Sequence, residues 1–197
     1  MPGQRIVTIP NLISVARLAC VPLFCWLLFD HDRLAAFCLL GALGATDWVD
    51  GYIARRFDQG SELGKILDPV ADRALLLTAA LALIIEGSVP LWVGVAVLTR
   101  EGIVAAATLS LAAAGARRID VQWAGKAGTL ALMFALPGFL LVEVLHPGAI
   151  RDVVHALTWL CTAGGLALGY YALIGYVPLA RAALREGRAA RQDRVAA

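Results

Sequence analysis

Apolar residues in this chain of 197 residues are gathered in six long runs, and short polar segments separate the runs. A run of roughly 20 apolar residues is long enough to cross a bilayer as a helix. The pattern therefore predicts an all-α integral membrane protein with six transmembrane helices. The predicted spans cover residues 11–29, 34–57, 63–85, 91–114, 123–145 and 151–184. The last helix is expected to end near Leu184 and to give way to a basic tail, residues 185–197.

The connections between these spans are too short to hold a second domain, so we expect a single domain over residues 1–197. Hydrophobic residues make up 60% of the chain, which is more than ordinary soluble domains carry. The N-terminus lacks a basic stretch followed by a short apolar core and a cleavage site, so the first span is expected to stay as an anchor. Four cysteines lie inside apolar runs without CxxC spacing and are expected to pack as small hydrophobic residues: Cys20, Cys25, Cys38 and Cys161.

Lysines and arginines near the span ends are distributed unevenly between the two sides of the predicted bundle. With the N-terminus in the cytoplasm, twelve of them fall on the cytoplasmic side and two, Arg33 and Arg151, on the other. Cytoplasmic loops of membrane proteins carry the excess of positive residues. We therefore expect both termini in the cytoplasm, in a bacterial cytoplasmic membrane, with the arginines of the tail near anionic lipid.

Four aspartates stand close together in a chain that is otherwise mostly apolar. Asp47 and Asp50 are three residues apart, and Asp68 and Asp72 are four apart. These spacings place the members of each pair on one face of a helix. We therefore expect two helices that each bring two carboxylates to a common point on the cytoplasmic side. Carboxylates crowded in an apolar setting repel one another and stay partly protonated unless cations lie between them.

The chemistry of such a cluster favours a divalent metal site. Oxygen ligands without cysteine or histidine suit Mg²⁺, Mn²⁺ or Ca²⁺ better than zinc. A two-metal site that promotes an in-line displacement at phosphorus is the nearest chemical template. Arg55 is suited to a bidentate contact with a phosphate. Gly51 and Gly64 either let a phosphate approach the backbone or allow two helices to pack closely.

These residues form a motif that resembles the signature of the CDP-alcohol phosphatidyltransferases. The motif is Asp47-x-x-Asp50-Gly51-x-x-Ala54-Arg55, eight residues, then Gly64-x-x-x-Asp68-x-x-x-Asp72. Over about residues 9–145 the chain is also similar to the phosphatidylglycerophosphate synthase branch, with cardiolipin synthases alike in this region. This similarity rests on Pro10-Asn11, Arg100-Glu101 and Gly125-Lys126. The resemblance implies a six-helix fold, usually homodimeric, with a polar cavity that faces the cytoplasm.

The resemblance also implies a reaction and residue roles. An alcohol hydroxyl would attack the lipid-bearing phosphorus of CDP-diacylglycerol and release CMP. The protein would act among membrane lipids, and no nucleic acid is expected as a partner. Asp72 would be the general base. The metal ligands, for two Mg²⁺ or Mn²⁺ ions, would be Asp47, Asp50, Asp68 and Asp72. The CDP site would be lined by Asp50, Gly51, Ala54, Arg55 and Gly64.

The acceptor alcohol is predicted to be glycerol 3-phosphate, which would make the product phosphatidylglycerophosphate. Phosphatidylglycerol, the acceptor of a cardiolipin synthase, is the close alternative, and inositol phosphate or serine rank lower. A buried cation needs an anion, so basic residues could bind an anionic acceptor. Glu101 is expected to pair with Arg100 only if the helix bends, because adjacent residues point about 100° apart. The basic residues are Arg17, Arg73, Arg100, Arg117, Arg118 and Lys126, although Arg117 and Arg118 also fit simple loop charge.

Two other classes of protein compete with this interpretation. A divalent-cation transporter could use the aspartates as a transit site, but transporters often show related features in both halves of the chain. Here all four aspartates fall in the first half. A membrane prenyltransferase of the aspartate-rich kind is expected to carry two aspartate motifs far apart in the chain, whereas this chain has one compact cluster.

A small-residue motif in the last span is a second helix-packing signal. Gly165 and Gly169 are four residues apart, which allows another helix to approach closely. The motif predicts either a contact between two copies of the chain or a contact within it.

Overall fold

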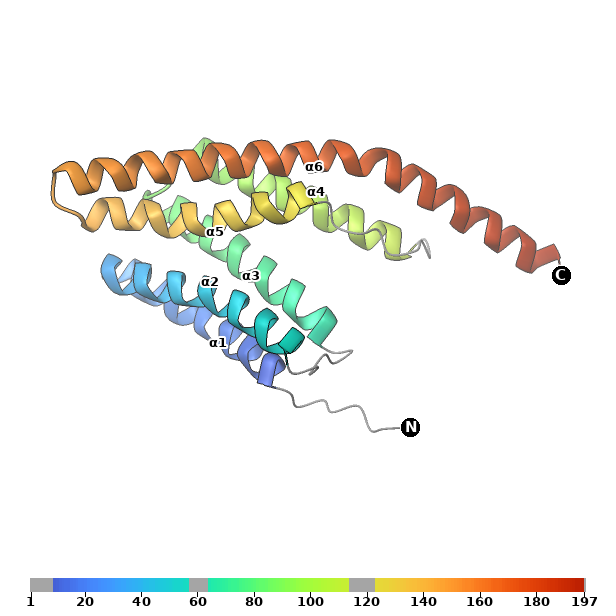
Figure 1. The fold of residues 1–197 in the computed structure, drawn as a ribbon, viewed down its shortest axis with the longest axis horizontal. Helices are drawn as coiled ribbons and strands as arrows, with labels where there is room; N and C mark the ends of the chain where they lie inside the picture. Colours follow the sequence, from blue (N-terminus) through green and yellow to red (C-terminus); the bar gives the residue numbers. More distant parts are fainter. Residues whose placement is uncertain (1–8, 57–63, 114–122, 197) are drawn as a thin grey trace.

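The computed structural model is all-helical, with six helices joined by short connections (Figure 1). It describes residues 9–56, 64–113 and 123–196, with side chains for residues 12–46, 71, 73–107 and 123–175. The predicted spans match the helices to within a few residues at their starts, so the all-α prediction is confirmed. The helices are α1 (Ile9–Phe29), α2 (Arg33–Arg56), α3 (Gly64–Glu86), α4 (Leu91–Ala113), α5 (Trp123–Val144) and α6 (Ala149–Ala196).

Three segments of the described chain are long and apolar enough to cross a membrane by length and composition. They are Leu12–Phe29, Trp123–Val144 and Ala149–Gly175. Large apolar side chains such as Trp26, Phe134 and Ile174 lie mostly exposed on the outside of the bundle. An apolar outer surface of this kind is what a lipid environment requires. Six crossings and the cytoplasmic location of both ends stay predictions.

Helix α6 is longer than predicted. It runs for 48 residues to Ala196, so the expectation that the helix ends near Leu184 is wrong. The segment after Leu184 is rich in alanine and arginine, which are among the strongest helix formers, and contains no proline. Gly187 alone is too weak a signal to end a helix that both flanking sequences favour.

The helices alternate in direction and enclose one apolar core. In Figure 1 the α1–α2, α3–α4 and α5–α6 turns lie together at the left, and the start of α1, the end of α2 and the start of α3 lie at the other end. Fully buried residues from α1 to α5 fill the core, among them Phe24 of α1, Ala36 of α2, Leu83 of α3, Val97 of α4 and Leu140 of α5. This core fixes the relative positions of α2 and α3, the two helices that carry the aspartates.

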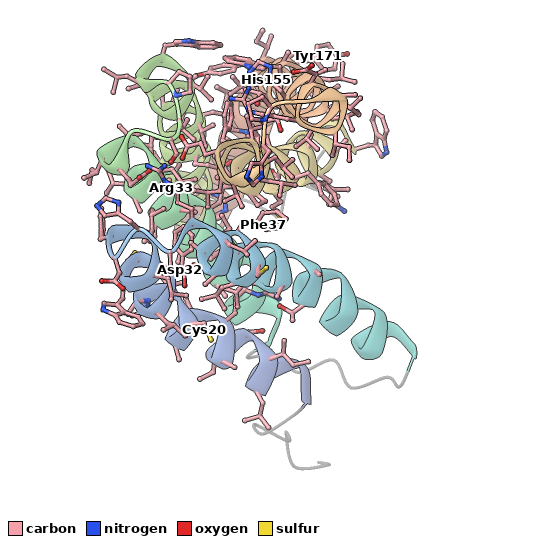
Figure 2. All side chains as sticks on the ribbon, turned by 90° about the vertical axis from the view of Figure 1, so that its left-hand side faces the viewer. Cys20, Asp32, Arg33, Phe37, His155 and Tyr171 are labelled. Carbon is pink, nitrogen blue, oxygen red and sulfur yellow. The ribbon has the colours of Figure 1, made fainter. Side chains whose placement is uncertain are left out.

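A polar cluster joins α2, α3 and α5 at the end where the turns lie. Arg33, the first residue of α2, lies in this region (Figure 2). Its Nη2 donates to Glu86 Oε1 at 2.6 Å, and its Nε lies 3.1 Å from Glu143 Oε2. Burial by itself raises the pKa of Glu86, but hydrogen bonds with Ser88 and Arg33 outweigh burial and hold the pKa below its usual value. Glu86 is therefore ionised at neutral pH, and the cluster ties the two halves of the chain together.

Helices α5 and α6 approach each other closely at three glycines. A Cβ atom on Gly128 would lie 2.9 Å from the carbonyl oxygen of Gly165 and 2.9 Å from the nitrogen of Gly169. A Cβ atom on Gly165 would lie 3.0 Å from the carbonyl oxygen of Gly128. Backbones come this near only where no side chain separates them. The Gly165–Gly169 motif therefore serves a contact within the chain.

We expect Gly165→Ala to lower the melting temperature of the purified protein in detergent. The added methyl group would lie 2.9 Å from Leu132 Cγ, and overpacking of this kind costs about 1–3 kcal/mol. Gly164→Ala is the matched control, because a Cβ on Gly164 meets no atom within 4 Å and alanine favours the helix. Equal melting temperatures for the two variants would contradict the close α5–α6 packing.

Candidate active site

The four aspartates lie on two helices that are consecutive in the chain. Asp47 and Asp50 belong to the last three turns of α2, and Asp68 and Asp72 belong to the first three turns of α3. Because the end of α2 and the start of α3 lie at the same end of the molecule, the two pairs are brought to one region (Figure 1). The backbone is helical at both pairs, as the spacing of the aspartates predicted. Their side chains lie outside those described, so the set of metal ligands stays a prediction.

Described side chains one turn away from the aspartates are buried in the bundle. On α2, Leu43 is buried and precedes Asp47 by one turn. On α3, the buried residues Ala71 and Leu75 follow Asp68 and Asp72 by three residues each. Residues three, four or seven apart share a helix face. The helix register therefore predicts that both aspartate-bearing faces turn inward, away from surrounding lipid.

A small apolar groove lies between α2, α3 and α5, whose side chains form its walls. Gly44 lies one turn before Asp47, and Leu75 lies one turn after Asp72. Apolar side chains therefore line the bundle interior next to the aspartate-bearing segments of α2 and α3. The lining residues are Leu40, Gly44, Leu75, Leu76, Ala79, Met133, Leu136 and Pro137.

Arg100 is buried in α4 and holds three helices together. It pairs with the next residue, Glu101, through Nη1. Nη1 also donates to Thr129 Oγ1 at 2.9 Å, and Nη2 donates to the carbonyl oxygen of Gly125 at 3.1 Å, both on α5. Gly169 of α6 makes room for the guanidinium, since a Cβ there would lie 2.9 Å from Arg100 Nε. The expectation that Glu101 could reach Arg100 only in a bent helix is wrong, because the long arginine side chain folds back within one continuous helix.

The other predicted acceptor residues are dispersed. Arg73 follows Asp72 on α3 and is half-buried. Lys126 is exposed in the first turn of α5. Arg117 and Arg118 lie outside the described residues, and so do the side chains of the predicted CDP site. Their roles stay predictions.

Two further polar residues stand out by their burial. Ser14 and Arg17 of α1 are almost completely inaccessible to solvent. Sequence reasoning considered Arg17 only as one of several cations and passed over Ser14. The signal that could have found them was their separation of three residues, which places a hydroxyl and a guanidinium on one face of an otherwise apolar span.

An apolar helix bundle with a cluster of carboxylates on two neighbouring helices defines a class of membrane-embedded enzymes that act on lipid substrates. The chain belongs to the CDP-alcohol phosphatidyltransferase family, whose model matches residues 7–164. The resemblance in the aspartate motif is thereby confirmed. The protein is a membrane transferase of phospholipid biosynthesis that uses CDP-diacylglycerol and an alcohol acceptor, and its family is generally dependent on divalent metals.

Similar proteins carry the names of two related activities. A cardiolipin synthase (CMP-forming) of Streptomyces coelicolor is 35% identical over 193 residues, 95% of this chain and 89% of that protein. A CDP-diacylglycerol–glycerol-3-phosphate 3-phosphatidyltransferase of Pseudomonas fluorescens is 35% identical over 81% of this chain and 84% of its own length. A probable phosphatidylglycerophosphate synthase of Mycobacterium tuberculosis is 34% identical over 78% of this chain and 76% of its own. The two activities share the donor and differ in the acceptor.

We expect Glu101→Gln to lower the free energy of unfolding by about 3–5 kcal/mol, the cost of leaving one partner of a buried ion pair without its counter-charge. Thermal unfolding in detergent measures the effect. Glu143→Gln is the control, because Glu143 is partly exposed in its contact with Arg33, and loss of such a pair costs less than about 1 kcal/mol. A Glu101→Gln variant as stable as the control would contradict the buried ion pair between Arg100 and Glu101.

Proposed function

We propose that this protein transfers the phosphatidyl group of CDP-diacylglycerol to the free hydroxyl of phosphatidylglycerol, with cardiolipin and CMP as products. The observation that carries the choice of acceptor is the similarity to the Streptomyces cardiolipin synthase, which extends over 95% of this chain. Glycerol 3-phosphate, the acceptor favoured by the sequence, is the second candidate. The relatives from Pseudomonas and Mycobacterium that are named for its use support it.

Two described features support a lipid acceptor over a small anionic one. The first is the lining of the groove beside the aspartate helices, which is entirely apolar and offers no charged group to a water-soluble phosphate. The second concerns Arg100, a main reason to expect a small anion. Its guanidinium already pairs with Glu101 and donates to Thr129 and Gly125, so its charge is compensated within the protein.

The donor set fits two Mg²⁺ or Mn²⁺ ions. The segment Asp47–Asp72 contains no histidine or cysteine, and hard oxygen ligands are the ones these ions prefer. The ions would neutralise the charge of the diphosphate and of the leaving group. We assign their binding to Asp47, Asp50, Asp68 and Asp72.

The proposed transfer is a single displacement at phosphorus. Asp72 accepts the proton of the acceptor hydroxyl, and the hydroxyl oxygen forms a bond to the lipid-bearing phosphorus. The bond from this phosphorus to the oxygen of the CMP phosphate breaks, and CMP leaves with the electron pair. The position of the carboxylate beside the acceptor contributes more than its basicity. We assign the CDP site to Asp50, Gly51, Ala54, Arg55 and Gly64, and contacts with the acceptor to Arg73, Arg117, Arg118 and Lys126.

The proposed setting is a homodimer in the bacterial cytoplasmic membrane, with one domain over residues 1–197 in each copy. Six helices would cross the bilayer, and the aspartates would face the cytoplasm. Twelve basic residues lie on the side of the termini and two on the opposite side, and this bias supports the proposed orientation.

Purified protein, given labelled CDP-diacylglycerol and Mg²⁺, is expected to release CMP and form cardiolipin when phosphatidylglycerol is added. The rate with glycerol 3-phosphate is expected to be at least about tenfold lower. Asp68→Asn should reduce CMP release by about 100-fold or more, because a misplaced metal ligand removes charge stabilisation that this reaction needs. Asp32→Asn is the control, since Asp32 caps α2 at the opposite end, where its Oδ1 accepts from the Ala35 nitrogen at 3.1 Å.

The outcomes separate the candidates. Faster turnover with glycerol 3-phosphate would replace the first acceptor by the second. No CMP release with any acceptor, or full activity of Asp68→Asn, would overturn the assignment of the site.

A further inference from the structure

The buried face of α1 changes from apolar to polar along the helix. Among its described side chains, residues 12–29, four are buried: Ser14, Arg17, Phe24 and Leu28. Their separations of three, seven and four residues place all four on one stripe. Phe24 and Leu28 belong to the apolar core, whereas Ser14 and Arg17 bring a hydroxyl and a guanidinium into the bundle. The polar part of the stripe lies toward the end where the aspartates are.

Arg17 lies at the same level as the aspartates along the bundle. It is eight residues from the first residue of α1, and Asp72 is eight residues from the first residue of α3. A rise of 1.5 Å per residue puts each about 12 Å from its helix start. Asp47 is nine residues from the end of α2. Since these helix ends lie at the same end of the molecule in Figure 1, the backbone positions of Arg17, Asp47 and Asp72 lie at a similar distance from that end.

The neighbouring helices limit the source of a counter-charge. A guanidinium within a span costs about 2.5–3.5 kcal/mol on insertion scales and is found paired. In the described structure α1 packs against α2 and α3, and Arg17 is engaged in an interaction. The acidic residues of those two helices are the four aspartates and Glu86. Glu86 is paired with Arg33 and lies 14 residues beyond Asp72, about 21 Å along α3.

We propose that Arg17 pairs with the aspartates of α3, foremost Asp72, and acts as a positioning residue for the reacting carboxylate. The inference rests on the proposed function of the aspartate cluster. A fixed guanidinium behind a carboxylate holds one oxygen in place and leaves the other directed at the metal and the acceptor. Arg17 also offsets part of the repulsion among the four carboxylates, so that the cluster forms before metal or substrate binds.

The pairing is tested by a double-mutant cycle on thermal stability in detergent with EDTA. Arg17→Met is expected to lower the melting temperature by several degrees, because it leaves the carboxylates without their counter-charge. Asp72→Asn in the Arg17→Met background should then cost little or raise the melting temperature, so that the two effects are not additive. The control cycle combines Asp72→Asn with Arg33→Met at the opposite end, where additive effects are expected. Additive effects for Arg17 with both Asp72 and Asp68 would overturn the proposal.

Turnover distinguishes positioning from a purely structural role. Arg17→Met, corrected for the folded fraction, is expected to lower kcat by about 10–100-fold with the KM for CDP-diacylglycerol nearly unchanged, a loss usual for partners of metal ligands. Arg17→Lys keeps the charge, so it is expected to fold and to recover part of kcat. A raised KM with unchanged kcat would show a contact with the donor phosphate instead and contradict the proposal. Absence of CMP release in the wild type would end the proposed function, while the stability cycle would still decide the pairing.

Discussion

Charge inside an apolar helix bundle has to be compensated locally, because hydrocarbon offers neither water nor counterions. The described polar groups of this protein follow that constraint. Arg33 pairs with Glu86 and Glu143 at one end, and Arg100 pairs with Glu101 in the middle of α4. The four aspartates are the largest concentration of charge on α2 and α3. Divalent cations and Arg17 are the compensation that we assign to them, which makes the charge balance of the cluster a condition for both folding and catalysis.

Three described contacts hold the bundle that carries this cluster. The close approach of Gly128 to Gly165 and Gly169 fixes α5 on α6, and the guanidinium of Arg100 ties α4 to α5 beside Gly169. At the other end Arg33 ties α2 to α3 and α5. The polar contacts of Arg33 thus hold α2 and α3 at the end far from the aspartates.

The sequence predicted the parts of the structure that depend on local pattern. The starts of the helices follow from the alternation of apolar runs and polar turns, and the spacing of Asp47, Asp50, Asp68 and Asp72 predicted a candidate site on two consecutive helices. The rotation of each helix about its axis was harder to predict, because an apolar span looks similar on every face. Burial of Arg17 therefore emerged only from packing. The Arg100–Glu101 pair was misjudged because a long arginine side chain can contact its neighbour although the two positions point in different directions. The length of α6 was misjudged because the alanines and arginines after Leu184 favour a helix even though apolar residues become rarer there.

The central claim is that the aspartates of α2 and α3 bind divalent cations and act on the diphosphate of a lipid nucleotide. Mn²⁺ binding to the purified protein, followed by electron paramagnetic resonance, tests it most directly. The account predicts about two bound ions in the wild type and at least tenfold weaker binding in both Asp47→Asn and Asp68→Asn. Glu86→Gln, whose carboxylate already pairs with Arg33, should bind as the wild type does. Unchanged Mn²⁺ binding in the two aspartate variants would contradict the account.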